Sequence, residues 1–366
     1  MNIQDILSKP EDAAGREGPS NKIVLSSRVR LARNLAKYPF ASRITEQQQQ
    51  DVIDEVLAAA KTSRSMSTAT YFGMSVLDGD ERRLLVERHL ISPTLADEKG
   101  ERGVLFNQDE SLSVMINEED HLRMQALLPG LQVDKAWMAI DQFDTALESN
   151  LDYAFCKRRG YLTACPTNLG TGIRVSAMLH LPGLVLSEQI NQIIQAVNKL
   201  GLAVRGLHGE GTEALGNVFQ VSNQMTLGET ESDIVERLNK VLLQIIDHEE
   251  NARAKLLENK AKMVYNHIGR AYGILANSHS ISSKETMNLL SLFRLGIDLS
   301  LFPGNKPALT EELFIITQPA HLQKTRAGKL SAEKRDILRA NLLRSRLLKV
   351  DRPATPDTGK TEENGE

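Results

Sequence analysis

The stretch Cys165-Pro-Thr-Asn-Leu-Gly-Thr-Gly-Ile-Arg174 carries one of the chain's two cysteines, together with two glycines, two threonines and an arginine. The glycines free the backbone to bend, so backbone N–H groups, a thiol and a cation can be brought to one point. Such a point suits a bound anion under attack by a nucleophile. We therefore expect this loop to lie in an active site.

The rest of the chain has the composition of an ordinary soluble globular protein. Its 366 residues suffice for one large or two medium domains, and 41% are hydrophobic and 25% charged. The formal net charge of −3 argues against a sequence-independent nucleic-acid binder. No apolar run approaches the roughly 20 residues that span a bilayer, and the N-terminus lacks a signal-peptide pattern. The two cysteines indicate a reducing compartment, so we expect a cytoplasmic protein.

The apolar pattern divides the chain into a mixed part and a helical part. Up to residue 228, short alternating runs indicate strands, and capped amphipathic runs indicate helices. The expected elements are a strand at Ile23–Leu25, a helix capped by Thr45, a strand at Leu112–Ile116 with one face more buried, a strand at Thr163–Ala164, a helix capped by Ser187 and a strand at Val218–Val221.

From about Glu229 to Leu275, apolar residues recur at helical spacing without a proline. Ser282 and Glu285 form a capping box for the next helix, and a last helix covers roughly 331–349. The fold class is therefore α+β. We expect a polar segment at 1–21, a mixed domain at 22–228, an all-helical domain at 229–350 and a disordered tail at 351–366.

Five arginines beside strand-ending or loop-forming sequence are candidates to bind phosphate. Arg28 and Arg30 are two residues apart, so an extended segment directs both to the same side. Together with Arg123, Arg174 and Arg205 they would match a triphosphate, because guanidinium forks bind phosphate oxygens bidentately. Neither a P-loop nor a Gly-x-Gly-x-x-Gly motif is present. The alternative is that each arginine is a solvated surface charge.

Two acidic groups could face a guanidinium substrate. They are Glu118-Glu119-Asp120 and the pair Glu210 and Glu213 in a glycine-rich stretch. Two carboxylates would align a guanidinium in line with a γ-phosphate and accept the proton that it loses. The alternatives are a helix that begins at Asn117, with Glu119 paired to Arg123, and a plain surface turn.

Cys165 has two interpretations of its own. A free cysteine often packs in a core as a small hydrophobic residue. Beside arginines its thiolate would instead be favoured, and a thiolate would hold and polarise a guanidinium.

Four segments, in this order, resemble the catalytic domain of the guanidino phosphotransferases, the ATP:guanido kinase family. They are Ser26-Ser-Arg-Val-Arg30, Asn117-Glu-Glu-Asp-His-Leu-Arg123, Cys165–Arg174, and the stretch from Arg205 to Asn223. The resemblance implies an antiparallel sheet flanked by helices, with ATP and Mg²⁺ as cofactors and no metal held by the protein itself. It also implies that Glu119 is the catalytic base, that Cys165 is the substrate-side thiol, and that Glu210 or Glu213 is the second carboxylate.

Within that family the chain is most similar to bacterial protein arginine kinases of the McsB type. They share Ile23-Val-Leu-Ser-Ser-Arg, Glu87-Arg-His-Leu-Ile-Ser-Pro93 and Arg205-Gly-x-x-Gly-Glu210. His208 stands where a tyrosine is expected in that subfamily. The nucleotide-binding residues implied by the resemblance are Ser26, Ser27, Arg28, Val29, Arg30, His89, Arg123, Arg174, Val175, Ser176, Ala177, Met178, Arg205, Gly206, Leu207, His208, Gly209 and Glu210.

The helical part carries the subfamily's Arg-Asp-x-x-Arg-Ala motif. It is formed by Arg335, Asp336, Arg339 and Ala340, and by resemblance it is an allosteric pocket for phosphoarginine. Two arginines at i and i+4 repel by a few tenths of a kcal/mol unless an acid or anion lies between them. The alternative is a basic, solvated helix, since further arginines follow.

The resemblance implies a protein arginine kinase. Small-substrate members carry an N-terminal helical domain that closes over a free guanidino compound, whereas only a short segment precedes Ser26 here. The implied partners are arginine-bearing proteins, a zinc-binding activator of the McsA type, a Clp ATPase, a stress-response repressor and a second copy of the chain. Two alternatives remain: a kinase for a free guanidino metabolite, and a catalytically silent adaptor that binds phosphoarginine.

Overall fold

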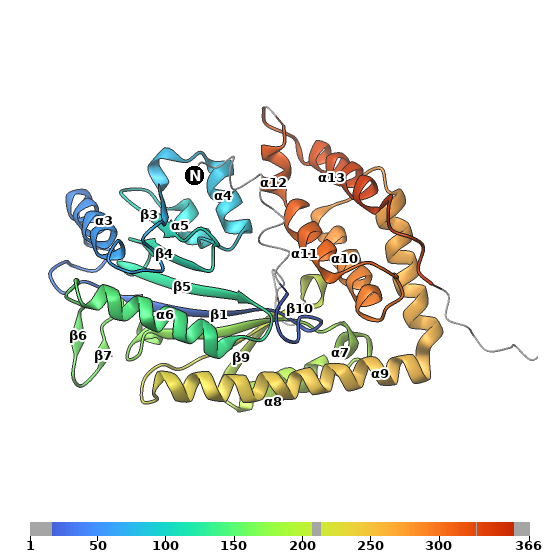
Figure 1. The fold of residues 1–366 in the computed structure, drawn as a ribbon, viewed down its shortest axis with the longest axis horizontal. Helices are drawn as coiled ribbons and strands as arrows, with labels where there is room; N and C mark the ends of the chain where they lie inside the picture. The colour runs from blue at the N-terminus through green and yellow to red at the C-terminus, as the bar shows by residue number, and fades with distance from the viewer. Residues whose placement is uncertain (1–16, 207–213, 327, 355–366) are drawn as a thin grey trace, which may run out of the picture.

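The computed structural model describes residues 17–206, 214–326 and 328–354. Figure 1 shows a sheet with its helices joined to a group of helices by one long helix, α9. Most of the polar segment predicted at 1–21 and nearly all of the predicted tail lie outside the described residues.

The mixed part is built on an eight-stranded sheet in the order β2-β3-β4-β5-β1-β8-β10-β9, with every neighbouring pair antiparallel. Its strands are β1 (Val24–Arg33), β2 (Thr70–Gly73), β3 (Gly103–Phe106), β4 (Leu112–Ile116), β5 (Leu122–Pro129), β8 (Ile173–His180), β9 (Leu202–Gly206) and β10 (Val218–Asn223). β6 (Phe155–Cys156) and β7 (Gly160–Tyr161) form a separate hairpin. The predicted antiparallel sheet is confirmed.

Helices flank the sheet and make up the C-terminal part. The first group is α3 (Glu46–Ala60), α4 (Gly79–Glu87), α5 (Pro93–Asp97), α6 (Val133–Glu148), α7 (Pro182–Leu186) and α8 (Ile190–Lys199). The second group is α9 (Glu231–Asn277), α10 (Ser283–Asp298), α11 (Pro307–Ile316), α12 (Pro319–Lys324) and α13 (Ala332–Leu347). The α+β fold with a helical C-terminal region is thus confirmed.

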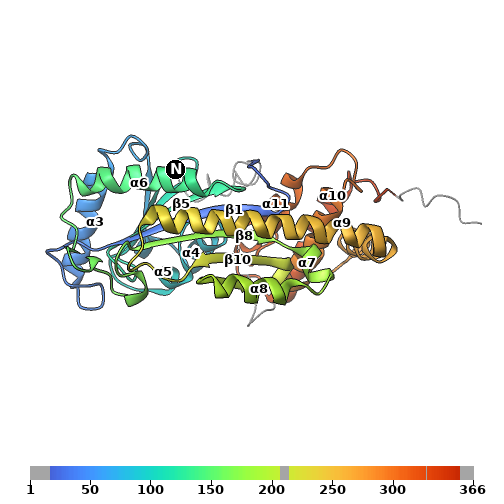
Figure 2. The ribbon, with the colours of Figure 1, turned by 90° about the horizontal axis from the view of Figure 1, so that it is seen from below.

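The alternation of residues in β1 gives the sheet one apolar and one polar face. Val29 and Leu31 are buried in the largest core, together with residues of α6 and α9. Figure 2 shows these two helices lying across the sheet. Arg28 and Arg30 occupy the intervening positions, so they point to the opposite face.

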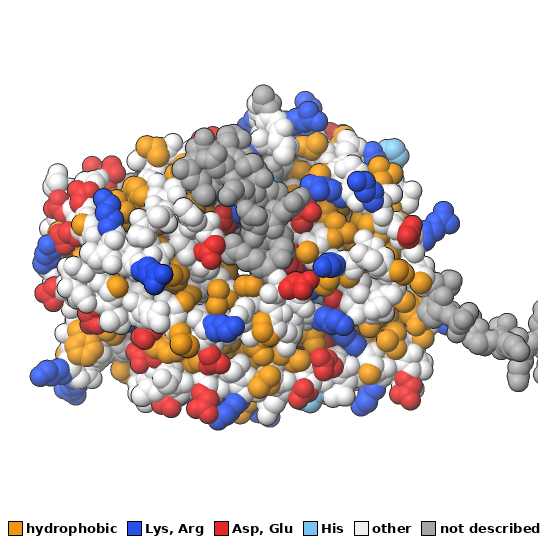
Figure 3. Space-filling model, viewed as in Figure 1, with side chains coloured by type: hydrophobic (Ala, Val, Ile, Leu, Met, Phe, Trp, Pro, Cys, Tyr) orange, Lys and Arg blue, Asp and Glu red, His pale blue; other side chains and the backbone are white. Residues whose placement is uncertain are grey.

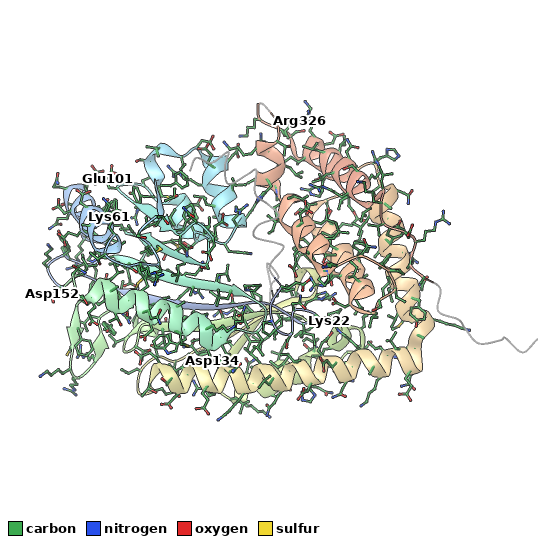
Figure 4. All side chains as sticks on the ribbon, viewed as in Figure 1. Lys22, Lys61, Glu101, Asp134, Asp152 and Arg326 are labelled. Atoms are coloured by element: carbon green, nitrogen blue, oxygen red, sulfur yellow. The ribbon has the colours of Figure 1, made fainter. Side chains whose placement is uncertain are left out.

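α9 contributes to two cores. Its first half, with buried residues from Ile234 to Ala252, packs with the sheet. Its second half, from Leu256 to Leu275, packs with α10 and α13. The helix departs from helical backbone angles at Lys260 (φ −138°), one turn after the first residue of the second half. A hydrogen bond ties the junction, because Arg253 donates to the carbonyl of Lys22 at 3.3 Å, a residue that Figure 4 labels where the sheet meets the helices.

Several predicted elements are confirmed. Thr45 caps α3 through a full capping box, whereas the box predicted for α10 is confirmed only in part, because Ser282 accepts the N–H of Glu285 but the described contacts include no return bond from the Glu285 side chain. The strand predicted at Val218–Val221 is β10, and the last predicted helix is α13, capped by Ser331.

Three local predictions are wrong. β4 is buried on both faces, because its side chains join two different cores. Thr163 and Ala164 are not in a strand and follow the β6–β7 hairpin instead. Ser187 ends α7 rather than starting the next helix, and α8 begins after Gln189.

The visible surface carries no large field of one sign. Figure 3 shows acidic and basic side chains interspersed on this face, in keeping with the net charge of −3. Among the residues described, no helix has the length and apolarity to cross a membrane.

Candidate active site

Four strands bring the predicted arginines to the polar face of the sheet. Arg30 on β1 lies directly opposite Arg174 on β8. Arg123 on β5 lies opposite Ala32, two residues from Arg30 and therefore on the same face. Arg28 donates to Gln220 at 2.8 Å, and Gln220 lies opposite Arg205 on β9. The expected convergence of the five arginines therefore follows from the strand register.

The arginines of this cluster have buried N–H donors that lack hydrogen-bond acceptors in the described part of the chain. The pKa of Arg28 is lowered to about 10 by burial and then by Arg123 and Arg174. The pKa of Arg30 is also lowered, by burial and then by Arg28, Arg123 and Arg174. The Nε atoms of Arg28, Arg30 and Arg174 are buried without a hydrogen-bond partner in the described part of the chain. Half-buried cations with enclosed, unpartnered Nε atoms fit a polyanion that supplies both charge and acceptors.

A cavity of about 160 Å³ opens beside the arginines. Arginine side chains line one side, and the acidic turn and the cysteine loop line the other. The lining residues are Arg30, Leu31, Ala32, Glu119, Asp120, Arg123, Cys165, Thr167, Asn168, Gly172 and Arg174. A phosphate chain and a second substrate could therefore meet at this cavity.

The acidic turn joins β4 to β5. Asn117 has φ 60°, and the chain reverses there instead of starting a helix, so the helical alternative is wrong. Arg123 pairs with Glu118 at 2.7 Å, not with Glu119. Glu118 is also held by the Ser92 hydroxyl. Glu119 is left exposed at the cavity, and its pKa is raised by partial burial and then by Asp120 and Glu118.

The cysteine loop is held in place from both sides. Asp120 accepts the N–H of Ala164 at 2.7 Å and the amide of Asn34 at 2.7 Å, which fixes the loop next to the acidic turn. The Thr226 hydroxyl lies 2.9 Å from the carbonyl of Thr167. Gly172 has φ 65°, and a Cβ there would lie 2.6 Å from the carbonyl oxygen of Ala32. The loop therefore needs glycine where it approaches β1.

Cys165 is half-buried, and its thiol is free. Its Sγ atom lies 3.0 Å from the Thr167 hydroxyl and lines the cavity. It belongs to none of the buried apolar cores, so it is not the core residue of the alternative interpretation.

The other predicted nucleotide residues are spread over both faces of the sheet. Ser26, Ser176 and Met178 share the face of the arginines. Ser27, Val29, Val175 and Ala177 alternate with them, and their side chains are buried toward the helices. The remaining described residues are His89, whose carbonyl accepts from Gln125 at 2.8 Å, and Gly206 at the end of β9.

Leu207, His208, Gly209, Glu210 and Glu213 lie outside the described residues. The second carboxylate and the loop that bears it therefore remain predictions.

Sequence analysis named Asp120 only as a member of the acidic group that could face a substrate, and it did not single out Gln125. Asp120 ties the acidic turn to the cysteine loop, and Gln125 lies opposite Arg30. Because Asp120 belongs to an acidic run, the sequence shows that a carboxylate stands at this position. Its function depends on a contact 44 residues away that spacing does not reveal.

The C-terminal motif lies on α13. Arg339 is 1% exposed, and it donates to the carbonyls of Thr317 at 2.8 Å and Ile281 at 2.9 Å. Asp336 pairs with it at 2.5 Å. Arg335 is half-buried and donates to the carbonyl of Leu330 at 2.8 Å. Because Arg339 is buried, a wholly solvated basic helix is excluded.

A sheet face of under-partnered arginines that meets a carboxylate and a thiol defines a phosphotransferase for guanidino groups. Residues 50–252 match the family described as ATP:guanido phosphotransferase, C-terminal catalytic domain, and the chain belongs to this family of ATP-dependent phosphotransferases. Residues 261–358 match the protein-arginine kinase McsB C-terminal domain.

Some relatives match nearly the whole length of this chain. A protein-arginine kinase of Desulforamulus reducens is 45% identical over 351 residues, which is 95% of this chain and 98% of the relative. One of Brevibacillus brevis is 48% identical over 337 residues, 92% of this chain and 94% of the relative. The solved structure of a lombricine kinase has a TM-score of 0.57 and 26% identity, over 68% of this chain and 71% of that one.

Proposed function

We propose that this kinase transfers the γ-phosphate of ATP to arginine side chains of proteins. The observation that carries the proposal is the cavity in which the arginine face meets Glu119 and Cys165. The helical C-terminal part and the names of the full-length relatives support proteins as the source of the arginine.

The arginine face binds and neutralises the phosphates. Arg28, Arg30, Arg123 and Arg174 surround the position of the β- and γ-phosphoryl groups, and their fixed charges stabilise the charge that spreads over the oxygens during transfer. Mg²⁺ bound to the phosphates would neutralise the remaining charge. Because Mg²⁺ is commonly held by substrate phosphates and water with few protein ligands, it fits a site rich in arginine.

Glu119 and Cys165 orient the incoming guanidinium. A guanidinium is almost fully protonated at neutral pH, so a proton must leave as its nitrogen attacks the γ-phosphorus. The new P–N bond forms while the bond to the β-phosphate oxygen breaks, and ADP leaves with that electron pair. Glu119 accepts the proton, and its raised pKa suits this task. The thiol of Cys165 holds the guanidinium from the side of the loop.

The direct test is incubation of the protein with ATP and either free arginine or an unfolded, arginine-bearing protein. We expect acid-labile phosphoarginine on the protein and little on the free amino acid. Phosphorylation of free arginine alone would establish a metabolite kinase instead. No transfer to either substrate, and no autophosphorylation, would favour the silent adaptor. Glu119→Ala should abolish transfer, and full activity in that variant would remove Glu119 as the base.

We also propose that α13 binds phosphoarginine at a second site. Arg335 offers a cation at the surface of the helix, and Asp336 and Arg339 lie on the adjoining turn. Arg335→Ala is the cleaner test, because Asp336→Ala would also remove a partner of the buried Arg339. Arg335→Ala should lower the binding of phosphoarginine to the protein while leaving ATP affinity nearly unchanged.

The cellular role follows from this activity. We propose that the kinase acts in the cytoplasm as a homo-oligomer, with a zinc-binding activator, and that its products include an inactivated stress-response repressor and proteins marked for a Clp protease. Recovery of phosphoarginine-bearing proteins by a Clp ATPase only when the active kinase is present would support this role. Equal recovery with the Glu119→Ala variant would contradict it.

A further inference from the structure

We propose that Glu87 and His321 form a latch through which the helical C-terminal part positions the nucleotide side of the active site. The latch joins the last residue of α4 to the first turn of α12. Glu87 accepts the N–H of Ala320 at 2.7 Å and that of His321 at 3.0 Å. It also accepts from Nδ1 of His321 at 2.7 Å. One carboxylate thus satisfies three donors of the other part of the chain.

The surroundings of the latch make α4 and α12 one packed unit. The Ala320 side chain belongs to the same buried core as Leu84 and Leu85 of α4. Lys324 at the end of α12 pairs with Asp78 at 2.7 Å, the N-cap of α4. In Figure 1, α12 is the helix of the C-terminal part that faces α4. A movement of α12 would therefore displace α4.

Two hydrogen-bonded routes lead from α4 to the cavity. His89 follows α4 with φ 61°, and its carbonyl holds Gln125, which lies opposite Arg30. The second route runs through α5, which begins next along the chain. Its N-cap, Ser92, donates to Glu118, and Glu118 holds Arg123 at 2.7 Å. The two routes thus end at Arg30 and Arg123, two of the arginines proposed to bind the phosphates.

One contact leads from the latch to the C-terminal motif. Arg339 donates to the carbonyl of Thr317, two residues before α12, and Asp336 pairs with the same guanidinium. An anion bound beside Asp336 would compete for Arg339 and alter its hold on Thr317. This part of the inference rests on the proposed phosphoarginine site, whereas the latch itself does not.

The latch gives a role to Glu87 at the start of the segment Glu87–Pro93, which the transfer chemistry does not use. Glu87 does not line the cavity and contacts no reacting group, so it is a positioning residue. At one end of the segment the Glu87 carboxylate accepts from α12, and near the other end the Ser92 hydroxyl donates to Glu118.

The test compares Glu87→Gln and His321→Asn with Arg83→Ala in the full chain. Glutamine places an NH₂ group against N–H donors, while asparagine removes only the ring contact. Arg83 lies on the same helix and pairs with Asp97 at the surface. We expect the KM for ATP to rise on the order of tenfold in Glu87→Gln, less in His321→Asn and not in Arg83→Ala, with kcat changing less than KM.

The double variant should be no worse than Glu87→Gln, because both changes open the same latch. In Glu87→Gln, phosphoarginine should still bind by calorimetry but no longer alter the KM for ATP. An unchanged KM in Glu87→Gln that melts like the parent would overturn the latch. If both kcat and the melting temperature fall while the KM for ATP stays unchanged, the contact is merely structural. If phosphoarginine does not bind the parent, the second site fails, and the KM values still decide the latch.

Discussion

Two sets of arginines, one buried in the helical part and one half-buried on the sheet, differ in their partners. In the helical part, Arg294 is fully buried and bonds to Asp298, Glu311 and the carbonyl of Asn21. Arg339 is equally enclosed and equally satisfied. On the sheet, Arg30 lies among other arginines, and its Nε has no partner in the described ranges. A buried arginine with a full set of acceptors stabilises the fold, whereas a half-buried arginine among like charges is suited to bind an anionic ligand.

The two kinds of arginine should contribute to the free energy of folding with opposite signs. A folded-state pKa below the ordinary value means that folding disfavours the charged form of the group. Arg30 remains charged in the unfolded chain at pH 7, so its burial opposes folding there. Around Arg339, carbonyls and a carboxylate replace the water that its guanidinium loses on folding. Loss of the two side chains should therefore have opposite effects on stability.

The largest effect is expected for Arg30→Ala. Its kcat/KM should fall about 10³-fold or more, as expected for a cation that stabilises a transferring phosphoryl group. Its free energy of unfolding should be unchanged or higher, because a repelled cation is removed. Steady-state kinetics and urea unfolding of the same preparation measure both. A clear loss of stability would break the contrast with Arg339.

Arg339→Ala should have the reverse profile. It leaves the carbonyls of Thr317 and Ile281 and the carboxylate of Asp336 without their donor, which should lower the free energy of unfolding by about 3–5 kcal/mol. Lys334→Ala is the matched control on α13, because its side chain is exposed and such a substitution changes stability by only about 0.5 kcal/mol or less. Similar unfolding curves for the two variants would show that Arg339 is not structurally required.

These arginines also show how far sequence reasoning extends. The alternation Arg28-Val-Arg30 predicted a shared face, and the Thr45 box predicted α3, because both rest on neighbours in the chain. The register that sets Arg30 against Arg174 joins residues 144 positions apart, so it came only through the family resemblance. The Glu118–Arg123 pair was missed because the positive φ of Asn117 turns the chain where a helix was considered.

Binding of a polyphosphate should also distinguish the two sets of arginines, through its effect on the stability of the variants. Tripolyphosphate or ADP at about 100 times its Kd should stabilise the parent by about 2.7 kcal/mol, and less at high salt. The same addition should not stabilise Arg30→Ala but should still stabilise Arg339→Ala, which keeps its phosphate site. Thermal unfolding with and without the anion gives the result. Stabilisation of Arg30→Ala as large as that of the parent would place the anion elsewhere.

The smallest expected effect concerns the acidic side of the cavity, where Glu118 is paired and Glu119 is not. Burial, Asp120 and Glu118 raise the pKa of Glu119, so the base becomes protonated, and activity falls, at a higher pH than for an ordinary glutamate. Asp120→Asn keeps the oxygen that accepts from Ala164 but removes a negative charge. The acid limb of kcat/KM should then move to lower pH by less than about one unit. Asp134→Asn on α6 is the control, and an equal shift there would mean that general charge, not the neighbour of Glu119, sets the limb.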